Sequence, residues 1–481
     1  MELVTKKAMK CIQEADVIVY DNLIDISLLN YASLNTELIY AGKEAANHYL
    51  SQGSIIELLM DKAREGKYVV RLKGGDPYLF GRGSEEALAL KEAGISYEIV
   101  SGVTSSIAVP AYAGIPVTDR RFVSSCHIIT AHREDEAGID FENISKLEGT
   151  LVFMMGLAKL HHIVQGLTLH SKASDTPVAV LSDGSRYNRR KCVGTLADIE
   201  EKVKEAKLLP PAIIVVGEVV SLSNELDNFL ERYSDKKLFR KKILLTGTRY
   251  ICNKIKAALA DEGCDIDEIS IIESVPIESD FYNNIEKYIE SHDYLVFSSA
   301  NGIRVFFEKL KELHNVDLRK LSNIKFAVIG KGSAQTLRNY GYIADFVPSS
   351  FSNKDLAVEL CKQLKGEKLL LLRAREASAE LAEELEANKV EYTDVPLYET
   401  FRDYRRTFDI KRLIKNYDYV VVASSITAHT LCEMVEDKAL LEGRVVSIGP
   451  VTTGTCKRLG VEPLMSAREY SVDGIVRVLL Q

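Results

Sequence analysis

The sequence predicts an α/β protein with several lobes, because strand-length apolar runs alternate with amphipathic helical stretches throughout the chain. A break rich in proline at 110–116 is followed by a second set of strands. From residue 241 onward the sequence repeats itself. Since 481 residues are too many for one core, these observations favour two halves, each with two lobes.

Composition excludes several classes of protein. With 46% hydrophobic and 27% charged residues, the chain fits neither disorder nor a membrane protein, and its apolar runs are far shorter than a bilayer span. A net charge of −8 without a long basic block argues against a nucleic-acid partner. Eight cysteines without a Cys-x-x-Cys pair, and a start without the apolar core of a signal peptide, predict reduced thiols and a cytoplasmic location.

The first elements place two polar residues at strand ends. Residues 2–14 have a helical period and 15–20 follow as a strand, after which comes Asp21. Lys43 follows the next apolar segment, 38–41. Because functional side chains collect at the carboxyl edge of parallel strands, both are candidate catalytic groups. The alternative is that each is a surface turn residue.

The stretch 69–83 organises the first half. Its apolar start, 69–72, predicts a buried strand that ends in Gly74-Gly75-Asp76-Pro77. Two glycines remove side chains from the strand end, so a flat ligand can lie against bare main chain beside the Asp76 carboxylate. The alternative is a purely structural turn.

A second small-residue turn follows at 102–106. A helix over 84–93 and a strand over 97–100 precede it, and Thr104 and Ser105 offer hydroxyls and open N–H groups to a ligand. The alternative is that one of them caps a helix, and both roles are compatible. Beyond the break, strands are predicted at 125–130, 150–154, 177–181 and 212–217.

These motifs occur together in one known family. The stretches 71–83, 102–106 and 111–116, Met155-Gly156 and 211–217 resemble uroporphyrinogen-III C-methyltransferase over about residues 1–230. The resemblance implies a two-lobed, homodimeric tetrapyrrole methyltransferase that uses S-adenosylmethionine (SAM) and needs no metal. By position it implies acid–base roles for Asp21 and Lys43, and SAM contacts at Gly74, Gly75, Asp76, Leu79, Thr104, Ser105, Met155 and Gly184.

Such a reaction suits these residues. A pyrrole carbon attacks the sulfonium methyl in line, so the protein mainly aligns two molecules. The ring then loses a proton, for which a carboxylate and an ammonium are suitable partners. Basic groups that suit the substrate's carboxylates are Lys43, Lys73, Arg82, Arg120 and Arg121. Family members begin with a strand and a Gly-x-Gly-Pro-Gly-Asp turn that this sequence lacks, so we expect an incomplete SAM floor.

The second half begins after a basic cluster. Residues 224–233 predict the end of a helix, 236–242 a solvated linker, and 243–245 a new strand. Residues 330–341 then match 449–460, and 293–299 match 418–424. Two similar lobes are therefore predicted. Their paired hydroxyls would face each other across an interlobe cleft suited to a polyanion: Ser299, Ser333, Ser424 and Thr452. The alternative is that these four are only N-caps.

Residues 241–481 resemble uroporphyrinogen-III synthase, with weaker motifs than the first half. The Pro-Leu-Tyr-Glu-Thr segment at 396–400 also fits the family, and the resemblance implies that Tyr398 stands where the family has a tyrosine near the cleft. The resemblance implies cyclisation of hydroxymethylbilane through a spiro intermediate, with Tyr398 as proton donor or hydrogen-bond guide. It also implies two lobes, one formed by 241–274 together with 399–481 and the other by 275–398. The chain is expected to cross between these lobes near 273–279 and again near 397–400.

Together the resemblances imply two linked activities. The methyltransferase domain is expected at 1–233, without the family's first strand and glycine-rich turn. The synthase domain is expected at 241–481. The expected function is conversion of hydroxymethylbilane to uroporphyrinogen III and its double methylation to precorrin-2, towards sirohaem or cobalamin. The alternatives are a synthase with an inactive truncated methyltransferase, or a tetrapyrrole-binding protein without turnover.

Overall fold

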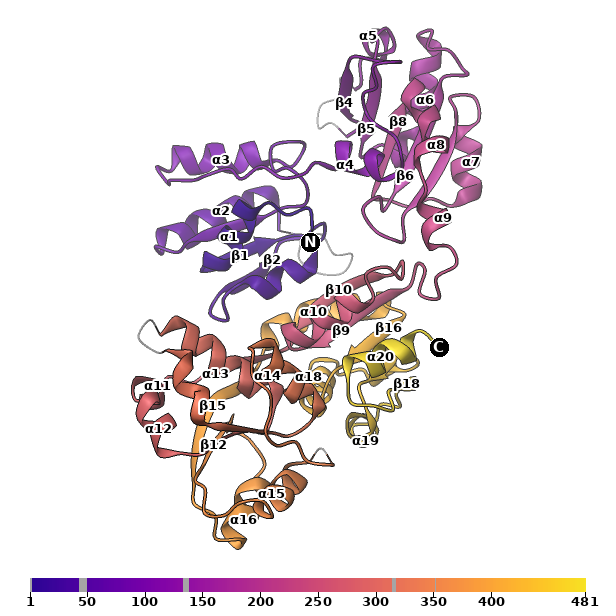
Figure 1. The fold of residues 1–481 in the computed structure, drawn as a ribbon. Helices are drawn as coiled ribbons and strands as arrows, with labels where there is room; N and C mark the ends of the chain where they lie inside the picture. The colour runs from indigo at the N-terminus through magenta and orange to yellow at the C-terminus, as the bar shows by residue number, and fades with distance from the viewer. Residues whose placement is uncertain (1, 43–49, 133–137, 314–316, 351) are drawn as a thin grey trace.

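The computed structural model describes residues 2–42, 50–132, 138–313, 317–350 and 352–481. Four sheets, each accompanied by helices, divide these residues into four lobes (Figure 1). The α/β fold class is confirmed. No helix within these ranges is long and apolar enough to cross a bilayer.

The first lobe is a small parallel sheet in the order β2-β1-β3. Its central strand β1 is buried at all four positions because it has a neighbour on each side. The elements are α1 (Lys6–Glu14), β1 (Val17–Tyr20), the 3-10 helix η1 (Ile26–Tyr31), β2 (Glu37–Tyr40), α2 (Gln52–Arg64), β3 (Val69–Leu72) and α3 (Gly83–Glu92).

Two expectations about this lobe are wrong. The strand predicted at 97–100 does not form, since that segment pairs with no strand among the described residues. The strand β3 is buried only at Leu72, and its other three residues are half-buried. Both differences have one cause: β3 is the edge of the sheet, and 97–100 does not join it there.

The second lobe has a mixed sheet in the order β4-β5-β8-β6-β7. The four predicted strands form, and β7, which was not predicted, adds a charged edge strand. The elements are α4 (Ser105–Tyr112), β4 (Cys126–Thr130), α5 (Phe141–Ser145), β5 (Thr150–Met154), η2 (Leu157–Lys159), α6 (Leu160–Leu169), β6 (Pro177–Ser182), β7 (Arg190–Thr195), α7 (Ile199–Ala206) and β8 (Ala212–Val216).

The segment between the halves also differs from expectation. The segment predicted as the end of a helix, 224–233, is divided between α8 (Ser223–Leu226) and α9 (Phe229–Tyr233), and η3 (Glu218–Leu222) precedes them. Asp227 causes the break, because its backbone is extended and its carboxylate accepts a hydrogen bond from Phe229 N at 3.0 Å. In the basic segment that follows, Leu238 is only 1% exposed and packs in the next core, so the linker is not fully solvated.

The third lobe is an all-parallel sheet in the order β10-β9-β16-β17-β18. Its elements come from two stretches of the chain: β9 (Lys242–Gly247), α10 (Arg249–Ala258) and β10 (Asp265–Ser270), then η5 (Tyr404–Arg406), α17 (Thr407–Leu413), η6 (Ile414–Asn416), β16 (Tyr419–Val422), α18 (Ser425–Met434), η7 (Lys438–Leu441), β17 (Val445–Ser447), α19 (Pro450–Arg458), β18 (Met465–Ser466) and α20 (Val472–Leu479).

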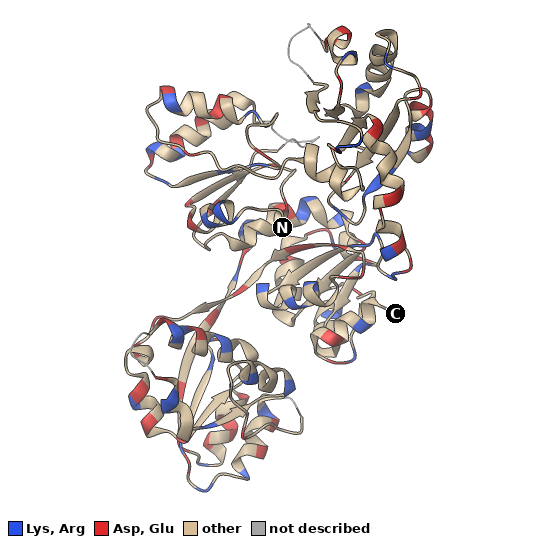
Figure 2. Ribbon diagram, turned by 45° about the horizontal axis from the view of Figure 1, so that its top comes forward, with Lys and Arg blue, Asp and Glu red and all other residues tan. Residues whose placement is uncertain are grey.

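The fourth lobe lies between those stretches and has the order β11-β15-β14-β12-β13. The antiparallel strands β11 and β15 lead into and out of it (Figure 2). Its elements are β11 (Ile272–Pro276), α11 (Asp280–Asn283), α12 (Ile285–Ser291), β12 (Tyr294–Phe297), α13 (Ala300–Glu312), η4 (Leu318–Asn323), β13 (Lys325–Val328), α14 (Lys331–Asn339), α15 (Asn353–Cys361), β14 (Leu369–Ala374), α16 (Glu380–Ala387) and β15 (Tyr392–Arg402).

The sequence repeat corresponds to a structural one. Asp293 precedes β12, and its carboxylate accepts a hydrogen bond from Lys368 N at 2.8 Å. Asp418 precedes β16 and accepts from Lys242 N at 2.8 Å. Each aspartate thus fastens its strand to the start of the neighbouring one, and each strand runs into a helix that begins after a serine.

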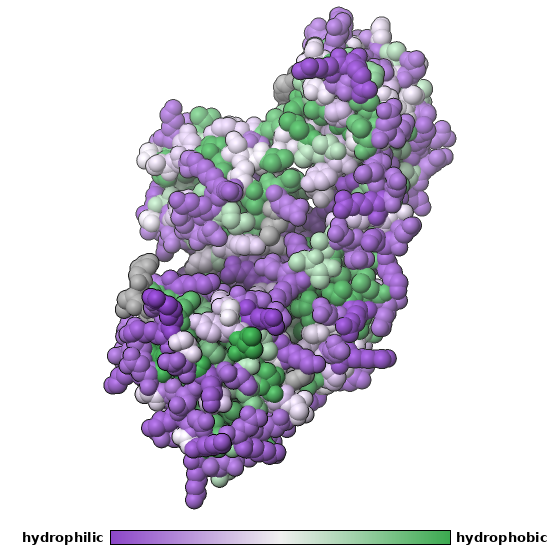
Figure 3. Space-filling model, in the orientation of Figure 1, coloured by the Kyte–Doolittle hydropathy of each residue, from purple (hydrophilic) through white to green (hydrophobic). Residues whose placement is uncertain are grey.

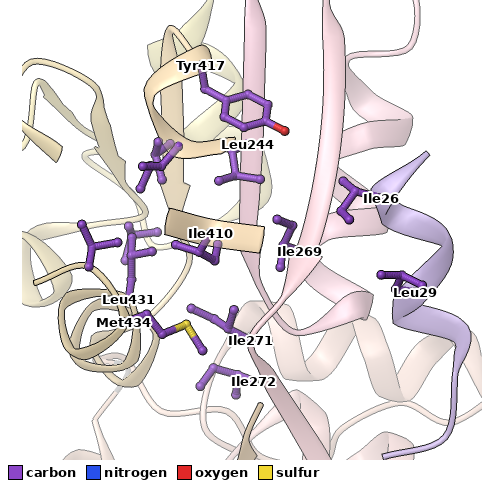
Figure 4. Close-up of a cluster of buried hydrophobic side chains, with 14 of the residues drawn as sticks. Ile26, Leu29, Leu244, Ile269, Ile271, Ile272, Ile410, Tyr417, Leu431 and Met434 are labelled. Carbon is purple, nitrogen blue, oxygen red and sulfur yellow. The ribbon is translucent and has the colours of Figure 1, made fainter. Parts of the chain in front are cut away.

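The first and third lobes share a core. One cluster of buried side chains joins Ile26 and Leu29 of η1 to Ile269 and Ile271 around β10 and to Ile410 of α17 (Figure 4). The two halves of the chain are therefore in apolar contact and are not joined by the linker alone.

Candidate active sites

The two small-residue turns of the first lobe form one structure. The Asp76 carboxylate accepts hydrogen bonds from Gly102 N at 3.1 Å and from Tyr78 N at 2.9 Å. A Cβ on Gly102 would lie 2.2 Å from Gly75 O, and Gly75 itself has φ +75°. Glycine is thus required at both positions by close approach and by backbone conformation. The turns predicted separately at 74–77 and 102–106 meet at Asp76.

Helix α4 connects this rim to the second lobe. Its N-cap is Thr104, whose Oγ1 accepts from Ser106 N at 3.3 Å, and Ser105 is its first residue. Further along, a Cβ on Gly184 would lie 2.2 Å from Val109 Cγ1, so the turn after β6 needs glycine in order to pack on α4. Candidate SAM positions from both lobes therefore border this helix.

Two further SAM candidates lie in turns. Leu79 N donates to Asp76 O at 3.3 Å, which places Leu79 in the rim turn itself. Met155 directly follows β5, has φ +55° and is 50% exposed. A left-handed backbone at a non-glycine residue is costly, and such positions concentrate at functional sites.

Asp21 lies at the same edge, beside ion-paired cations. Its carboxylate is 3.4 Å from Arg71 Nη2 and accepts from Leu23 N at 3.0 Å. The buried Glu86 carboxylate pairs with Arg71 at 3.4 Å and with Lys73 at 3.2 Å. Burial lowers the pKa of Lys73, and the neighbouring Arg71 charge acts in the same direction. Lys43 lies outside the described residues.

Sequence reasoning missed Arg71 and Glu86. A charged residue inside the apolar run 69–72 was the available signal, because a partly buried cation requires a partner. Other cations expected to meet substrate carboxylates are also paired: Arg82 Nε is 2.8 Å from Glu85 Oε1, and Arg121 Nε is 2.9 Å from Asp119 Oδ1. Lys73, Arg82 and Arg121 thus already have carboxylate partners.

The second site contains a buried phenol. Tyr398 on β15 is 5% exposed, and its Oη shares a hydrogen bond of 2.9 Å with Ser299 Oγ. Ser299 also caps α13 by accepting from Gly302 N at 3.0 Å. Burial raises the pKa of Tyr398, while the bond to Ser299 and the charge of Arg304 act in the opposite direction. The phenol is therefore protonated at neutral pH and can donate a proton or a hydrogen bond.

The four predicted hydroxyls fall into two kinds. Ser299 and Ser424 are N-caps, Ser424 by accepting from Thr427 N at 3.2 Å. Ser333 and Thr452 are third residues of α14 and α19, so the N-cap alternative fails for them. Thr452 Oγ1 is buried and has no hydrogen-bond partner among the described residues. Across the described chain, no hydrogen bond joins Ser299 or Ser333 to Ser424 or Thr452.

The helices behind these hydroxyls begin with glycine. Gly330 precedes α14 and Gly449 precedes α19, and neither helix has a side-chain hydrogen bond at its N-cap. Their first N–H groups are thus without a side-chain acceptor, which favours an anionic ligand there. In the described ranges, no group of three or more His, Cys, Asp or Glu residues is arranged to hold a metal ion.

Comparison with known proteins gives matches for both halves. A family model described as tetrapyrrole (corrin/porphyrin) methylases matches residues 1–200, and one described as uroporphyrinogen-III synthase HemD matches residues 253–477. A porphyrin biosynthesis protein HemD of Ruminiclostridium josui is 34% identical over 486 residues, which cover 100% of this chain and 95% of that protein.

Two further relatives match the first half. A uroporphyrinogen-III C-methyltransferase of Methanocaldococcus jannaschii is 49% identical over 223 residues, covering 46% of this chain and 92% of that protein. The solved structure of uroporphyrin-III C-methyl transferase from Thermus thermophilus, complexed with S-adenyl homocysteine, is 33% identical with a TM-score of 0.40. It covers 46% of this chain and 94% of its own.

Proposed function

The chain belongs to the family that joins a tetrapyrrole methylase to a uroporphyrinogen-III synthase, and from this premise we propose how its residues divide the work. It is a bifunctional enzyme of tetrapyrrole synthesis. Residues 241–481 cyclise hydroxymethylbilane to uroporphyrinogen III. Residues 1–233 then methylate that product twice, with SAM as donor, to precorrin-2 on the route to sirohaem or cobalamin.

The observation that carries the synthase assignment is the Tyr398–Ser299 pair. Cyclisation begins with departure of the substrate's hydroxyl group as water, which requires a proton. Tyr398 supplies or guides that proton, since burial keeps its phenol protonated and Ser299, at 2.9 Å, fixes its direction. The remaining task is to hold the linear substrate in a folded conformation.

Helix starts in both lobes are suited to hold that substrate. The first N–H groups of α14 and α19 have no side-chain cap, and Ser333 and Thr452 lie one turn inside them. Oriented N–H groups and hydroxyls bind carboxylates, which the bilane carries along its whole length. Ser299 and Ser424, at the starts of α13 and α18, complete the set proposed for tetrapyrrole binding.

For methyl transfer, we assign the SAM site to the rim at Asp76. Gly74 and Gly75 expose main chain there, and Gly75 lies against Thr104, which fits a flat nucleoside. The other proposed SAM contacts are Asp76, Leu79, Ser105, Met155 and Gly184. SAM, when bound, supplies the methyl group. Asp21, held by Arg71, is proposed to accept the proton that the methylated ring loses, and Lys43 is proposed to assist that transfer.

We also propose a homodimer formed through the methyltransferase half. Large hydrophobic side chains are exposed on the rim turn and on α4: Tyr78, Phe80, Val103, Ile107 and Tyr112. Figure 3 shows hydrophobic residues at the surface where the first and second lobes approach each other. Such a concentration favours a partner subunit or a substrate. A cytoplasmic location is supported by the eight cysteines, all of which are free.

One experiment tests the assignment as a whole. The full chain is supplied with hydroxymethylbilane and SAM, and ring closure and methyl transfer are followed separately. Both products are expected. If neither forms, the proposed function is rejected, and tight porphyrinogen binding without turnover would identify a non-catalytic binding protein.

A second candidate is a chain that only cyclises. It is favoured by the first lobe, where three strands form the described sheet and Asp21 is already ion-paired. Calorimetric titration with SAM separates the candidates: binding heat supports methyl transfer, whereas its absence together with normal ring closure supports the synthase alone.

A further inference from the structure

A tyrosine ring between the third and fourth lobes is held by two cations. Tyr250 belongs to α10 of the third lobe. Arg304 of α13, in the fourth lobe, places its Cζ 3.8 Å from the centre of the ring. Lys254, one turn after Tyr250, places its Nζ 4.5 Å from the same centre. Two positive charges from opposite lobes therefore converge on one aromatic side chain.

Neither cation is neutralised by an ion pair. Within the described ranges, no carboxylate oxygen lies within 4 Å of Arg304 or Lys254, whereas the buried Arg373 of the fourth lobe is paired with Asp394. Arg304 Nη2 donates to the neutral Asn301 Oδ1, and its Nε is buried without a hydrogen-bond partner. Burial lowers the pKa of Arg304, which reflects the cost of its desolvation.

The nearest carboxylates do not remove this excess of charge. Glu308, one turn further along α13, and to a smaller extent Glu273 act on Arg304 through space without forming an ion pair with it, and Glu273 is itself paired with Arg249 at 3.7 Å. A partly buried guanidinium with a free Nε is costly unless an anion reaches it. The arrangement is thus suited to a ligand that brings its own negative charge.

The cations also lie beside the proposed catalytic pair. Ser299 caps the same helix that carries Arg304. The positive charge of Arg304 is also close enough to Tyr398 to lower the pKa of its phenol. On the other side, Thr336 of α14, one turn after Ser333, lies near enough to Tyr250 to lower the pKa of its phenol. A group bound between Arg304 and Lys254 is therefore next to both helix starts of the fourth lobe.

We propose that Arg304 and Lys254, held across the lobe boundary by Tyr250, bind one carboxylate of the linear tetrapyrrole substrate. Arg304 offers its free Nε and the N–H donors of its planar guanidinium, and Lys254 offers an exposed ammonium. The contact fixes one pyrrole side chain relative to Tyr398 and so helps to set the fold of the bilane. This inference rests on the proposed synthase function and names a specificity-determining contact within it.

The test uses the full chain with Arg304→Gln, which removes the charge and keeps a polar side chain. The KM for hydroxymethylbilane is expected to rise roughly tenfold to a hundredfold, as for loss of a charge-assisted hydrogen bond, with a much smaller change in kcat. Arg304→Lys should restore part of the loss, and Lys254→Gln should give a smaller increase. A matched control is Arg319→Gln, whose side chain is 91% exposed and paired with Asp317.

Two readouts separate a binding role from a structural one. The KM of the unaltered protein should rise with ionic strength, and this dependence should be weaker in Arg304→Gln. Binding of uroporphyrin III, followed by its fluorescence, should weaken in Arg304→Gln and not in Arg319→Gln, whether or not turnover occurs. An unchanged KM and unchanged binding would overturn the inference while leaving the synthase assignment intact. Absence of cyclisation by the unaltered chain would instead reject the proposed function.

Discussion

Tyr398 combines burial, a fixed hydrogen bond and proximity to a cation in one side chain. Its Oη lies 2.9 Å from Ser299 Oγ across 99 residues of sequence, and the raised pKa keeps its proton in place at neutral pH. A phenol that must donate in the transition state gains from being held in this way.

We therefore expect Tyr398→Phe to slow ring closure by roughly tenfold to a hundredfold and to leave methylation of added uroporphyrinogen III unchanged. Separate assays of the two reactions on the same preparation would measure this. Equal losses in both activities would contradict separate sites. Tyr392→Phe, on the same strand, is a suitable control because its exposed hydroxyl contacts only Glu386 among the described residues.

Tyr20 is a second buried phenol, and its effect is on stability. Both oxygens of Asp409 accept from its Oη at 3.1 Å. Burial first, and then the Asp409 charge, raise the pKa of Tyr20 well above its ordinary value of 10.0. Because the folded state holds this proton more tightly than the unfolded state, the stabilisation is complete below pH 10 and is lost as pH rises further.

The expected result is that Tyr20→Phe lowers the free energy of unfolding by about 1.5–3 kcal/mol at pH 8, as for a hydrogen bond to a charged group. The difference between the two proteins should begin to shrink above pH 10, where the unfolded tyrosine protein starts to lose its proton and the folded one keeps it. Chemical denaturation at each pH measures it. A difference that stays constant with pH would show that the hydroxyl acts without titrating.

At the scale of elements, the rim at Asp76 depends on how closely two turns approach each other. Gly102 is the most constrained position, because its missing side chain admits Gly75 O. Helix α4 then begins directly after its N-cap Thr104, with the positive end of its dipole at the same place. The geometry of the proposed SAM site is thus set by backbone contacts between the turn at 74–77 and the turn at 102–106. Only the first of these turns follows a strand of the sheet, β3.

Gly102→Ala should consequently separate the turns and weaken SAM binding at least tenfold, since the added Cβ would lie 2.2 Å from a carbonyl oxygen. Isothermal titration calorimetry with S-adenosylhomocysteine is the measurement. The control is Gly53→Ala in α2 of the same lobe, where a Cβ meets only Ser51 Oγ at 3.7 Å and helix propensity improves. Equal affinity in all three proteins would place the SAM site elsewhere.

For the whole molecule, the main feature is that the halves share buried polar contacts as well as a core. The edge strand β10 is covered by the methyltransferase half at two points. Ser27 Oγ accepts from Glu268 N at 2.9 Å, and the Asp265 carboxylate accepts from Tyr187 N at 2.8 Å. An exposed edge strand invites aggregation, so this cover protects the third lobe.

A buried ion pair lies at the centre of the same contact. Arg406 and Asp409 are each 1% exposed and pair at 3.1 Å. The guanidinium also donates to Asn30 Oδ1 at 2.7 Å and to Ile26 O at 3.2 Å. A buried pair needs such additional partners to offset desolvation, and here they come from the other half of the chain. The third lobe is therefore completed by the first.

From this we expect the first and third lobes to unfold in a single calorimetric transition. Asn30→Ala should lower its midpoint by several degrees, because it leaves Arg406, Ser270 N and Glu268 O without a shared partner. Asn143→Ala, an exposed contact to Asp140, is the control. Two separate transitions in the unaltered chain would show that the lobes are energetically independent.

The sequence by itself determined the local features. Apolar periodicity located most strands and helices, and the internal repeat identified two similar lobes before any contact was known. Glycine-rich turns and serines at strand ends identified the candidate sites, since residues a few positions apart specify turns and caps. The two family resemblances followed from the same local motifs.

Only the tertiary structure decided the pairings. It joined Asp76 to Gly102 and Ser299 to Tyr398, left 97–100 outside the sheet, and brought Arg304 over Tyr250. It also buried Arg406 against a segment of the chain about 380 residues away. The physical reason is that hydrogen bonds, ion pairs and burial depend on which distant segments meet, and periodicity within one segment carries no information about its partner.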